Sequence, residues 1–552
     1  MQAISRRRFF DLTAKTALGL GAARVLGPFE ALADEPAPGI REIDAFVQRH
    51  IREMGAPGLT LGLADRKGVI AVRTYGHTDV KTGRPVAPED LFEIGSITKS
   101  FTALSLLRLR EEGKLDLNRP IREYLPWLRI ESAYAPITAH HLLTHTSGLP
   151  NPLSLPSMPL WTAHAPGEHF HYCNLGYEIL GLLLTSLDGR PLRDVFRARI
   201  FEPLGMTASE GVISHDIRPR LALSYWPAFD DRPFQRHGPI TEAPNIAMDN
   251  AAGCIASTPR DMALYMRMLL NQGRPLVSKQ SFALFTKPAI PAPGFGKDAG
   301  YGYGIAIQPV EGRTILRHTG GMVSFSSAMH VDLDSGFGTF ASVNASLAGY
   351  RPNAVAGYAL TALRTVPIPP APEFDDPYKV PNTADYTGTY TAPDGKQLKI
   401  AAAGDRLELV HKGKRLPLER IAPDNFWAPD PAFALFPLSF ERDGDKVVEV
   451  SHGGDWYAGE RYKGPRTFET PPEYRAYAGH YRNEDPWMGS ARVVLRKGRL
   501  WLGGAPLMPL GGGLFRIGEE EHEPDRVLFQ EVFNGRALRA VFSGTEFRRV
   551  ET

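Results

Sequence analysis

Cysteine is almost absent from this 552-residue chain, which contains only Cys173 and Cys254. Two thiols allow at most one disulfide, and its formation depends on the separation of the two Cα atoms, which sequence spacing does not give. We expect two small buried thiols, and their pairing stays open. The histidines at positions 140, 141, 169 and 171 lack a ligand spacing with thiols or carboxylates. No metal site and no cofactor are therefore predicted.

Long apolar runs and an excess of one charge sign are also lacking. No stretch of the sequence after the N-terminal region is long and apolar enough to span a bilayer. Lysine and arginine number 63 against 61 aspartates and glutamates, which leaves a net charge of +2. Without residues 1–33 the counts are 58 and 59, a net charge of −1. This balance argues against nucleic acid or an anionic membrane as a partner.

The N-terminus has the features of an export signal. Residues 5–10 read Ser-Arg-Arg-Arg-Phe-Phe, similar to the twin-arginine motif, and a weakly apolar stretch follows from Thr16 to Phe29. Residues 31–33 read Ala-Leu-Ala, an Ala-x-Ala cleavage site. We expect residues 1–33 to be a twin-arginine signal peptide and the mature protein to be periplasmic.

A Ser-x-x-Lys pair opens an apolar-periodic segment in the first third of the chain. Ser96 and Lys99 precede leucines at positions 104, 106, 107 and 109, a pattern that predicts a helix. Residues three apart share a face of a helix, so both side chains would point into the same space from its first turn. A serine hydroxyl becomes a nucleophile when a neighbouring group takes its proton, and this spacing places an amine one turn away.

Two further polar motifs follow in order. Tyr172 and Asn174 form a Tyr-x-Asn between a Pro-Gly turn and an apolar helix expected over residues 175–187. A phenolate is favoured by a nearby ammonium and can act as a general base. An asparagine amide can donate to a substrate carbonyl while it accepts from a lysine. The third motif is His318-Thr319-Gly320-Gly321, at the end of a strand expected over residues 314–318, where glycines allow close backbone approach.

This ordered triple resembles the serine β-lactamase and penicillin-binding-protein superfamily, whose motifs include Ser-x-x-Lys and a Lys-Thr-Gly strand. Tyr-x-Asn in second place is similar to the class C β-lactamase branch and its esterase and D-aminopeptidase relatives. The resemblance covers about residues 40–366 and includes four further segments, at residues 143–150, 201–206, 252–258 and 301–304. It implies an α/β (α+β) β-lactamase-like sandwich, with an antiparallel sheet and a helical lobe.

The resemblance also implies roles for these residues. Ser96 is the nucleophile, Lys99 and Tyr172 share the proton transfers with the choice of base left open, and Asn174 orients the substrate carbonyl. His318, Thr319 and Gly320 line the strand edge, and the amides of Ser96 and Gly321 form the oxyanion hole. Acylation of Ser96 would be followed by attack of water, without metal or cofactor. The partner is then a small-molecule or peptide substrate, and the oligomeric state is open.

Two positions depart from the family pattern. His318 stands where β-lactamases have lysine, which weakens the case for binding β-lactams or C-terminal carboxylates. Cys173 stands at the middle of Tyr-x-Asn, where small residues are usual. We expect a D-aminopeptidase-like or esterase-like hydrolase acting on small peptides, amides or esters. The alternatives are a β-lactamase or D-Ala-D-Ala carboxypeptidase, and an inactive protein that binds cell-wall fragments.

The chain is too long for one core, and its C-terminal third differs in composition. We expect the hydrolase domain over residues 34–366 and a proline-rich linker over 367–380, followed by an internal repeat of about ninety residues. Residues 384–390, Ala-Asp-Tyr-Thr-Gly-Thr-Tyr, match residues 475–481, Arg-Ala-Tyr-Ala-Gly-His-Tyr. The repeats predict two small antiparallel β-barrels, lipocalin-like, at 381–466 and 467–552. Their tyrosines and Trp501 are predicted to be barrel core.

Overall fold

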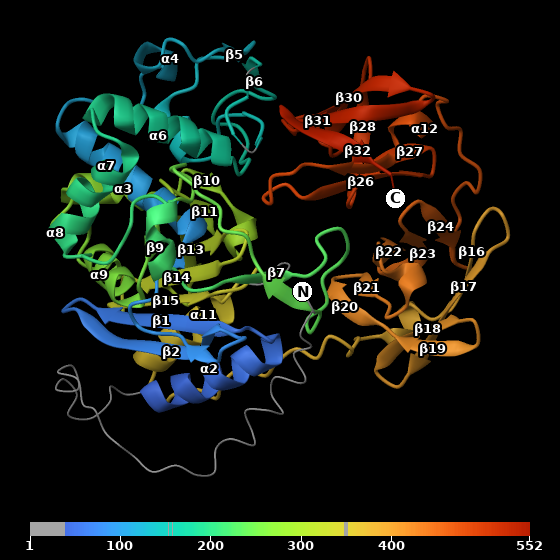
Figure 1. Ribbon diagram of the computed structural model, residues 1–552, viewed down its shortest axis with the longest axis horizontal. Coiled ribbons are helices and arrows are strands. Elements are labelled where there is room, and N and C mark those ends of the chain that lie inside the picture. Colours follow the sequence, from blue (N-terminus) through green and yellow to red (C-terminus); the bar gives the residue numbers. More distant parts are fainter. Residues whose placement is uncertain (1–38, 153, 157, 347–350, 552) are drawn as a thin grey trace. The chain divides into compact units, whose positions relative to one another are not determined.

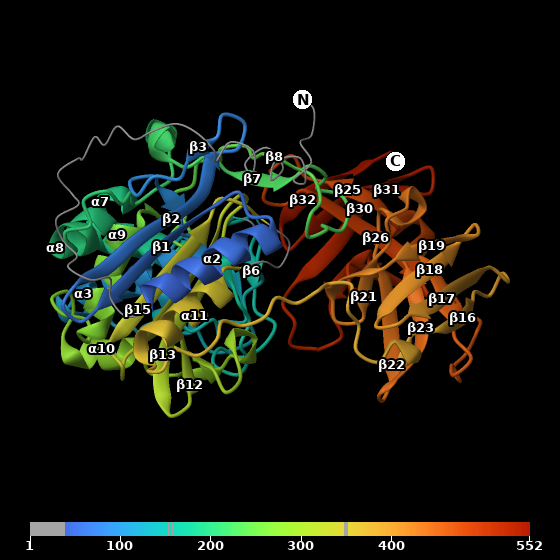
Figure 2. The same cartoon turned by 90° about the horizontal axis from the view of Figure 1, so that it is seen from below.

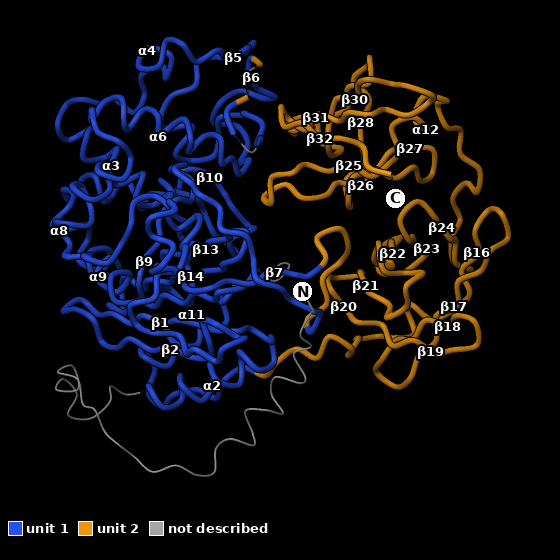
Figure 3. The backbone as a smooth tube through the Cα atoms, in the orientation of Figure 1, with its two compact units in different colours: residues 1–155, 159–228, 237–372 blue, residues 156–158, 229–236, 373–552 orange. Residues whose placement is uncertain are grey.

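The computed structural model describes residues 39–551 except 153, 157 and 347–350. The predicted signal peptide therefore lies outside the described residues. The chain forms two compact units (Figure 3). The first comprises the described parts of Met1–Leu155, Pro159–Ala228 and His237–Pro372, and the second those of Pro156–Met158, Phe229–Arg236 and Glu373–Thr552. Within the described residues, no helix is both long and apolar enough to cross a membrane.

The first unit is built on a nine-stranded antiparallel sheet. Its strand order is β10-β11-β12-β13-β14-β15-β1-β2-β3, so the first strand of the chain pairs with the last strand of this unit. Both ends of the first unit thus enter one sheet around a helical insertion, which gives the antiparallel sheet and helical lobe that the resemblance implies. The strands are Gly58–Asp65 (β1), Val69–Asp79 (β2), Arg84–Pro85 (β3), Ile290–Pro291 (β10), Gly300–Tyr301 (β11), Ala306–Val310 (β12), Arg313–Gly321 (β13), Ser326–Asp332 (β14) and Phe337–Val343 (β15).

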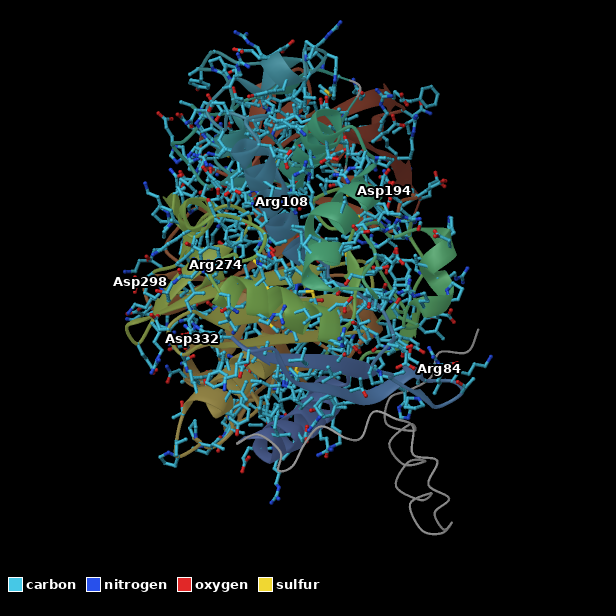
Figure 4. The ribbon with its side chains drawn as sticks, turned by 90° about the vertical axis from the view of Figure 1, so that its left-hand side faces the viewer. Arg84, Arg108, Asp194, Arg274, Asp298 and Asp332 are labelled. Carbon is cyan, nitrogen blue, oxygen red and sulfur yellow. The ribbon has the colours of Figure 1, made fainter. Side chains whose placement is uncertain are left out.

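Helices pack against this sheet. Helix α11 (Asn353–Arg364) packs on β14 and β15 and against α2 (Ile40–Met54), while α9 (Pro259–Leu270) packs on β1 and β15 (Figures 1 and 2). Helix α2 buries one apolar stripe, Ile40, Ile43, Phe46 and Val47, because residues at this spacing share a helix face. Asp332, labelled in Figure 4, is buried at the end of β14 and forms an ion pair with Arg364 of α11 at 2.7 Å.

The helical lobe surrounds helix α3, which carries the Ser-x-x-Lys lysine. Helix α3 (Thr98–Glu111) is buried along most of its length and packs against α6 (Asn174–Asp188), α7 (Leu192–Phe196) and α10 (Lys279–Phe285). Arg108, labelled in Figure 4, donates from α3 to the carbonyl of Arg199. The remaining described helices of the lobe include Ile121–Tyr124 (α4), Ala139–Leu143 (α5) and Glu202–Leu204 (α8), and short strands include Phe92–Glu93 (β4) and Ala256–Ser257 (β9). Helix α3 is thus enclosed by the other helices of the lobe.

The second unit contains the two predicted barrels, which confirms the fold class. The first barrel is a nine-stranded antiparallel sheet whose edge strands, β19 and β20, are consecutive and separated only by Leu418, so it is nearly closed. The second is a closed barrel, β25 to β32, in which the first strand pairs with the last. The strands of the first barrel are Gly388–Thr391 (β16), Gln397–Ala403 (β17), Arg406–His411 (β18), Lys414–Pro417 (β19), Glu419–Ala422 (β20), Asn425–Trp427 (β21), Leu438–Asp443 (β22), Lys446–His452 (β23) and Asp455–Ala458 (β24). Those of the second are Gly479–Arg482 (β25), Ser490–Arg496 (β26), Arg499–Leu502 (β27), Ala505–Gly511 (β28), Leu514–Ile517 (β29), Arg526–Phe533 (β30), Arg536–Phe542 (β31) and Thr545–Val550 (β32).

The repeated tyrosines take matching places in the two barrels. Tyr390 and Tyr481 belong to the two barrel cores, and each donates its hydroxyl to the carbonyl of the residue four positions earlier. The prediction that Trp501 belongs to the barrel core is wrong. It is half-buried, and its ring lies under the guanidinium of Arg496 at 4.2 Å. Its place at position three of a short strand puts it on the outer face, because side chains alternate along a strand.

A short segment from the middle of the chain also belongs to the barrel unit. Residues Phe229–Arg236 connect β7 (Tyr225–Pro227) to β8 (Ile240–Glu242). Two ion pairs hold the segment to the second barrel, Asp230 with Arg482 and Asp231 with Arg492 at 2.9 Å. The barrel unit is therefore assembled from segments that are far apart in sequence.

Candidate active site

Ser96 lies in a tight turn directly before α3. The turn is a 3₁₀ segment, Gly95–Ile97, rather than the first turn of the α-helix itself, which begins at Thr98. Gly95 has a φ of +54°, and a Cβ at this residue would lie 2.8 Å from the backbone nitrogen of Gly321. Only glycine fits there without displacing the neighbouring strand. The turn therefore brings the Ser96 region against the end of β13.

Lys99 is the polar centre of the site. Its Nζ donates to Ser96 Oγ at 3.0 Å, to Asn174 Oδ1 at 2.8 Å and to the carbonyl of Ala252 at 2.9 Å. The side chain is fully buried, and this burial lowers the pKa of Lys99 from 10.5 to about 7. A lysine with such a pKa is substantially neutral at neutral pH, and its free amine can accept the Ser96 proton.

The ring of Tyr172 faces the Nζ of Lys99. Lys99 Nζ lies 4.9 Å from the ring centroid. Burial raises the pKa of Tyr172 above its ordinary value, although a hydrogen bond with Ser96 and the charge of Arg351 oppose the rise. The expected stabilisation of a phenolate by the lysine is therefore outweighed by desolvation. This geometry favours Lys99 over Tyr172 as the base and makes the tyrosine a neutral hydrogen-bonding group.

The middle residue of Tyr-x-Asn caps the helix that begins at Asn174. Cys173 is the N-cap of α6, where its sulfur accepts from the amide of Gly176 at 3.3 Å, and its own amide donates to His145 Nδ1 at 3.0 Å. Its thiol donates to the carbonyl of Pro150 at 3.2 Å. Cys173 and Cys254 are both buried free thiols. Cys173 thus replaces the usual small residue with a group that caps the helix carrying Asn174.

The third motif lies within a strand and not beyond its end. Strand β13 continues to Gly321, three residues further than predicted, because Thr319, Gly320 and Gly321 pair with β14. A Cβ on Gly320 would lie 1.8 Å from the carbonyl oxygen of Ile94. Gly320, the first glycine of the motif, is therefore required for the strand to pass the turn that carries Ser96.

His318 is neutral and fully engaged by its neighbours. It is 1% exposed, its Nε2 is 2.9 Å from Tyr301 Oη, and its Nδ1 is 2.7 Å from the carbonyl oxygen of Thr319. Burial first and the charge of Lys99 second lower the pKa of His318 to about 3. The position occupied by lysine in β-lactamases thus carries no charge at neutral pH.

Sequence reasoning missed two residues that border the site. A Cβ on Gly321 would meet Arg351 Nη2 at 2.3 Å, so this guanidinium packs directly against the end of β13. The ring of Phe295 lies 5.3 Å from His318 and 6.2 Å from Tyr172, centroid to centroid. No local pattern around either residue indicates a site, because Phe295, in the short 3₁₀ helix Pro293–Phe295, and Arg351, in a loop, are brought here only by tertiary packing.

All three predicted motifs therefore converge at one place within the first unit. Within residues 39–551 as described, no group of three or more histidine, cysteine, aspartate or glutamate side chains could hold a metal ion. His145 is buried, and its Nδ1 accepts a hydrogen bond from the amide of Cys173.

A family model described as Beta-lactamase matches residues 43–362, which is more than half of the chain. The chain belongs to the Beta-lactamase family. This confirms the resemblance drawn from the three motifs and makes the protein a member of a family of hydrolases. The match ends before the barrels, which lie outside the family model.

Individual relatives are distant. Protein Rv1367c of Mycobacterium tuberculosis is 30% identical over 271 residues, which span 41% of this chain and 66% of that protein, slightly less than two thirds of its length. The structure of the octameric penicillin-binding protein homologue from Pyrococcus abyssi has a TM-score of 0.55 at 25% identity and covers 76% of this chain and 99% of its own. EstCE1, a hydrolase with promiscuous acyltransferase activity, has a TM-score of 0.50 at 21% identity, covering 59% of this chain and 98% of its own. That last likeness concerns the fold alone.

Proposed function

We propose that the protein is an exported serine hydrolase that forms an acyl-enzyme at Ser96 with small peptide, amide or ester substrates. The observation that carries the proposal is the contact of a buried lysine with the serine hydroxyl, 3.0 Å from Nζ to Oγ. Family membership supports hydrolysis, and the twin-arginine-like N-terminus supports export. The activity of the whole protein is inferred from the site and not from its relatives.

The reaction follows from the contacts of Lys99. Its neutral amine takes the Ser96 proton while Oγ bonds to the substrate carbonyl carbon, and the carbonyl electrons move to the oxygen. We expect the amides of Ser96 and Gly321 to donate to this oxyanion, and each such donor is worth about 3–4 kcal/mol. The ammonium returns the proton to the leaving amine or alcohol as the bond to it breaks. Water then repeats the sequence on the acyl-enzyme and releases the acid.

The neutral His318 favours substrates without a carboxylate at the strand edge. A lysine there would supply a charge-assisted contact of about 1.5–3 kcal/mol. We therefore expect uncharged esters and amides, or substrates with a free amine, to be preferred.

A β-lactamase or D-Ala-D-Ala carboxypeptidase is the second candidate, and one observation favours it. The guanidinium of Arg351 packs against Gly321, close to the expected carbonyl position, and a guanidinium binds carboxylates well. Arg351→Gln would lower turnover of a cephalosporin and leave that of a neutral ester unchanged if this candidate is right.

The test is a substrate panel with a matched pair of variants. Nitrophenyl esters, D- and L-aminoacyl nitroanilides, D-Ala-D-Ala peptides and a chromogenic cephalosporin are compared with wild-type protein. Ser96→Ala should abolish turnover and labelling by a fluorophosphonate. Ser105→Ala, in the helix that follows Ser96 and hydrogen-bonded to the carbonyl of Phe101, should leave both unchanged. Wild-type turnover in Ser96→Ala would refute the acyl-enzyme. Absence of turnover on the whole panel would favour the inactive binding protein.

A further inference from the structure

A cleft of about 810 Å³ lies between the two barrels of the second unit. Its apolar lining includes Phe436, Met488, Val494, Trp501, Phe542 and Phe547. Volumes of this size, apolar walls and a few polar groups at a junction of domains are typical of small-molecule sites. The catalytic motifs contribute nothing to the cleft, so it is separate from the site described above.

Outer faces of strands from both barrels form part of the walls, and the core residues Phe440, Phe542 and Phe547 also line the cleft. On β22, Phe440 belongs to the core of the first barrel, so its neighbour Glu441 points outward. On β26, Val493 belongs to the core of the second barrel, and Val494 and Arg496 line the cleft. Strands of both barrels therefore enclose this space.

Arg496 is a buried cation in the cleft wall. It is 8% exposed, donates from Nη1 to Ser451 Oγ at 2.6 Å, and stacks over Trp501 at 4.2 Å. Its Nε hydrogen has no acceptor among the described residues. The carboxylate nearest to it is that of Glu441, 3.9 Å from Nη2, which is at the limit of an ion pair. An unmatched donor on a buried charge is costly.

The counter-charge near Arg496 is incomplete. Glu449 is held by Lys497 at 2.8 Å and by Trp456 Nε1 at 2.9 Å. Burial and the neighbouring Glu449 carboxylate raise the pKa of Glu441. This shift favours the neutral form of Glu441, whose contact with Arg496, at 3.9 Å, is long for an ion pair.

The other two arginines in the lining are better matched. Arg232 and Arg492 both reach Asp231, each at 2.9 Å. Among the described lining residues, Arg496 is thus the guanidinium best placed to gain a carboxylate.

We propose that this cleft is a second ligand site, which binds a small organic acid with an aromatic or aliphatic body. The carboxylate pairs with Arg496, and the body lies against Trp501 and the phenylalanine side chains. Apolar contact supplies most of the affinity, and the charge-assisted pair supplies selectivity for an acid over its neutral amide. The inference does not depend on the chemistry of Ser96.

Calorimetric titration of the full chain tests the proposal with two probes of equal shape, 4-phenylbutyrate and 4-phenylbutanamide. We expect one site per chain that binds the acid roughly ten- to hundred-fold more tightly than the amide, the usual value of a charge-assisted contact. The acid should also raise the melting temperature, since it binds only the folded protein.

Variants localise the binding. Arg496→Gln should reduce acid binding to the level of the amide. Because Arg496 also bridges the barrels, Val494→Trp serves as a second variant that keeps the arginine and fills the cleft, and it should remove binding of both probes. Arg499→Gln, an exposed arginine on the adjacent β27, should bind both as the wild type does. Equal affinity for acid and amide, no binding of either, or unchanged acid binding in Val494→Trp would each overturn the proposal.

Discussion

The pH dependence of hydrolysis should report the burial of Lys99. Its pKa is lowered from 10.5 to about 7 because the side chain is fully enclosed. About half of the molecules then carry a free amine at pH 7, against roughly one in 2,500 for a lysine of ordinary pKa. Burial thus raises the population of the active base by about three orders of magnitude at neutral pH.

We expect kcat/KM to rise tenfold per pH unit below about pH 7 and to level off above it, because only the neutral amine accepts the Ser96 proton. The assay is hydrolysis of the best ester of the panel from about pH 5 to about pH 9, corrected for spontaneous hydrolysis. Lys99→Arg keeps the positive charge but does not deprotonate in this range. It should lose at least about 100-fold in kcat/KM and lack the acidic limb.

Protein stability supplies an independent readout of the same pKa. The folded pKa of Lys99 lies below its unfolded value, so the unfolded chain binds the extra proton between about pH 7 and 10.5. The free energy of unfolding should rise with pH across this window by up to about 1.4 kcal/mol per pH unit. Below pH 7 the cost of protonating the buried Lys99 destabilises the folded protein in full. Lys99→Met should remove the pH dependence of the free energy of unfolding that Lys99 causes. The measurement is urea unfolding of the two proteins at each pH.

Two results would refute this reasoning. One is a kcat/KM that still rises tenfold per pH unit up to about pH 9, which would mean that Lys99 titrates as an exposed lysine. The other is wild-type activity in Lys99→Arg, which would assign the base to another group.

Three further predictions concern other parts of the chain. Gly320→Ala should lower kcat/KM by about 100-fold, because a displacement of about 1 Å at the site has this effect. Gly68→Ala, where an added Cβ meets open space, should leave kcat/KM unchanged. Equal effects of the two variants would contradict the close approach of Gly320 to the Ser96 turn. His318→Lys should raise kcat/KM for a cephalosporin relative to a neutral ester at neutral pH, and an efficient wild-type cephalosporinase, near about 10⁶ M⁻¹s⁻¹, would contradict a neutral strand edge. Replacement of Arg6 and Arg7 by lysine should leave precursor in the cytoplasm, as seen by fractionation and intact mass, and periplasmic protein that retains residues 1–33 would argue against cleavage.

Local sequence patterns determined much of the fold and the identity of the main site residues. The spacing of Ser96 and Lys99, the Tyr-x-Asn before an apolar helix and the glycines after His318 are short-range features, and they led to the family now shown by its model. The internal repeat predicted two barrels because each copy of the repeat forms a barrel from its own strands. These inferences succeed because periodicity and turn residues act over a few positions.

Only the tertiary structure decided how the site works electrostatically. The shift in the pKa of Lys99, the rise in that of Tyr172 and the neutrality of His318 all come from burial by segments far away in the chain. Arg351 borders the site through packing that no local pattern around it encodes. Trp501 lines a cleft instead of a core because neighbouring strand faces enclose it. Desolvation and packing depend on which distant segments meet, and that is set by the assembled chain and not by the sequence near any one residue.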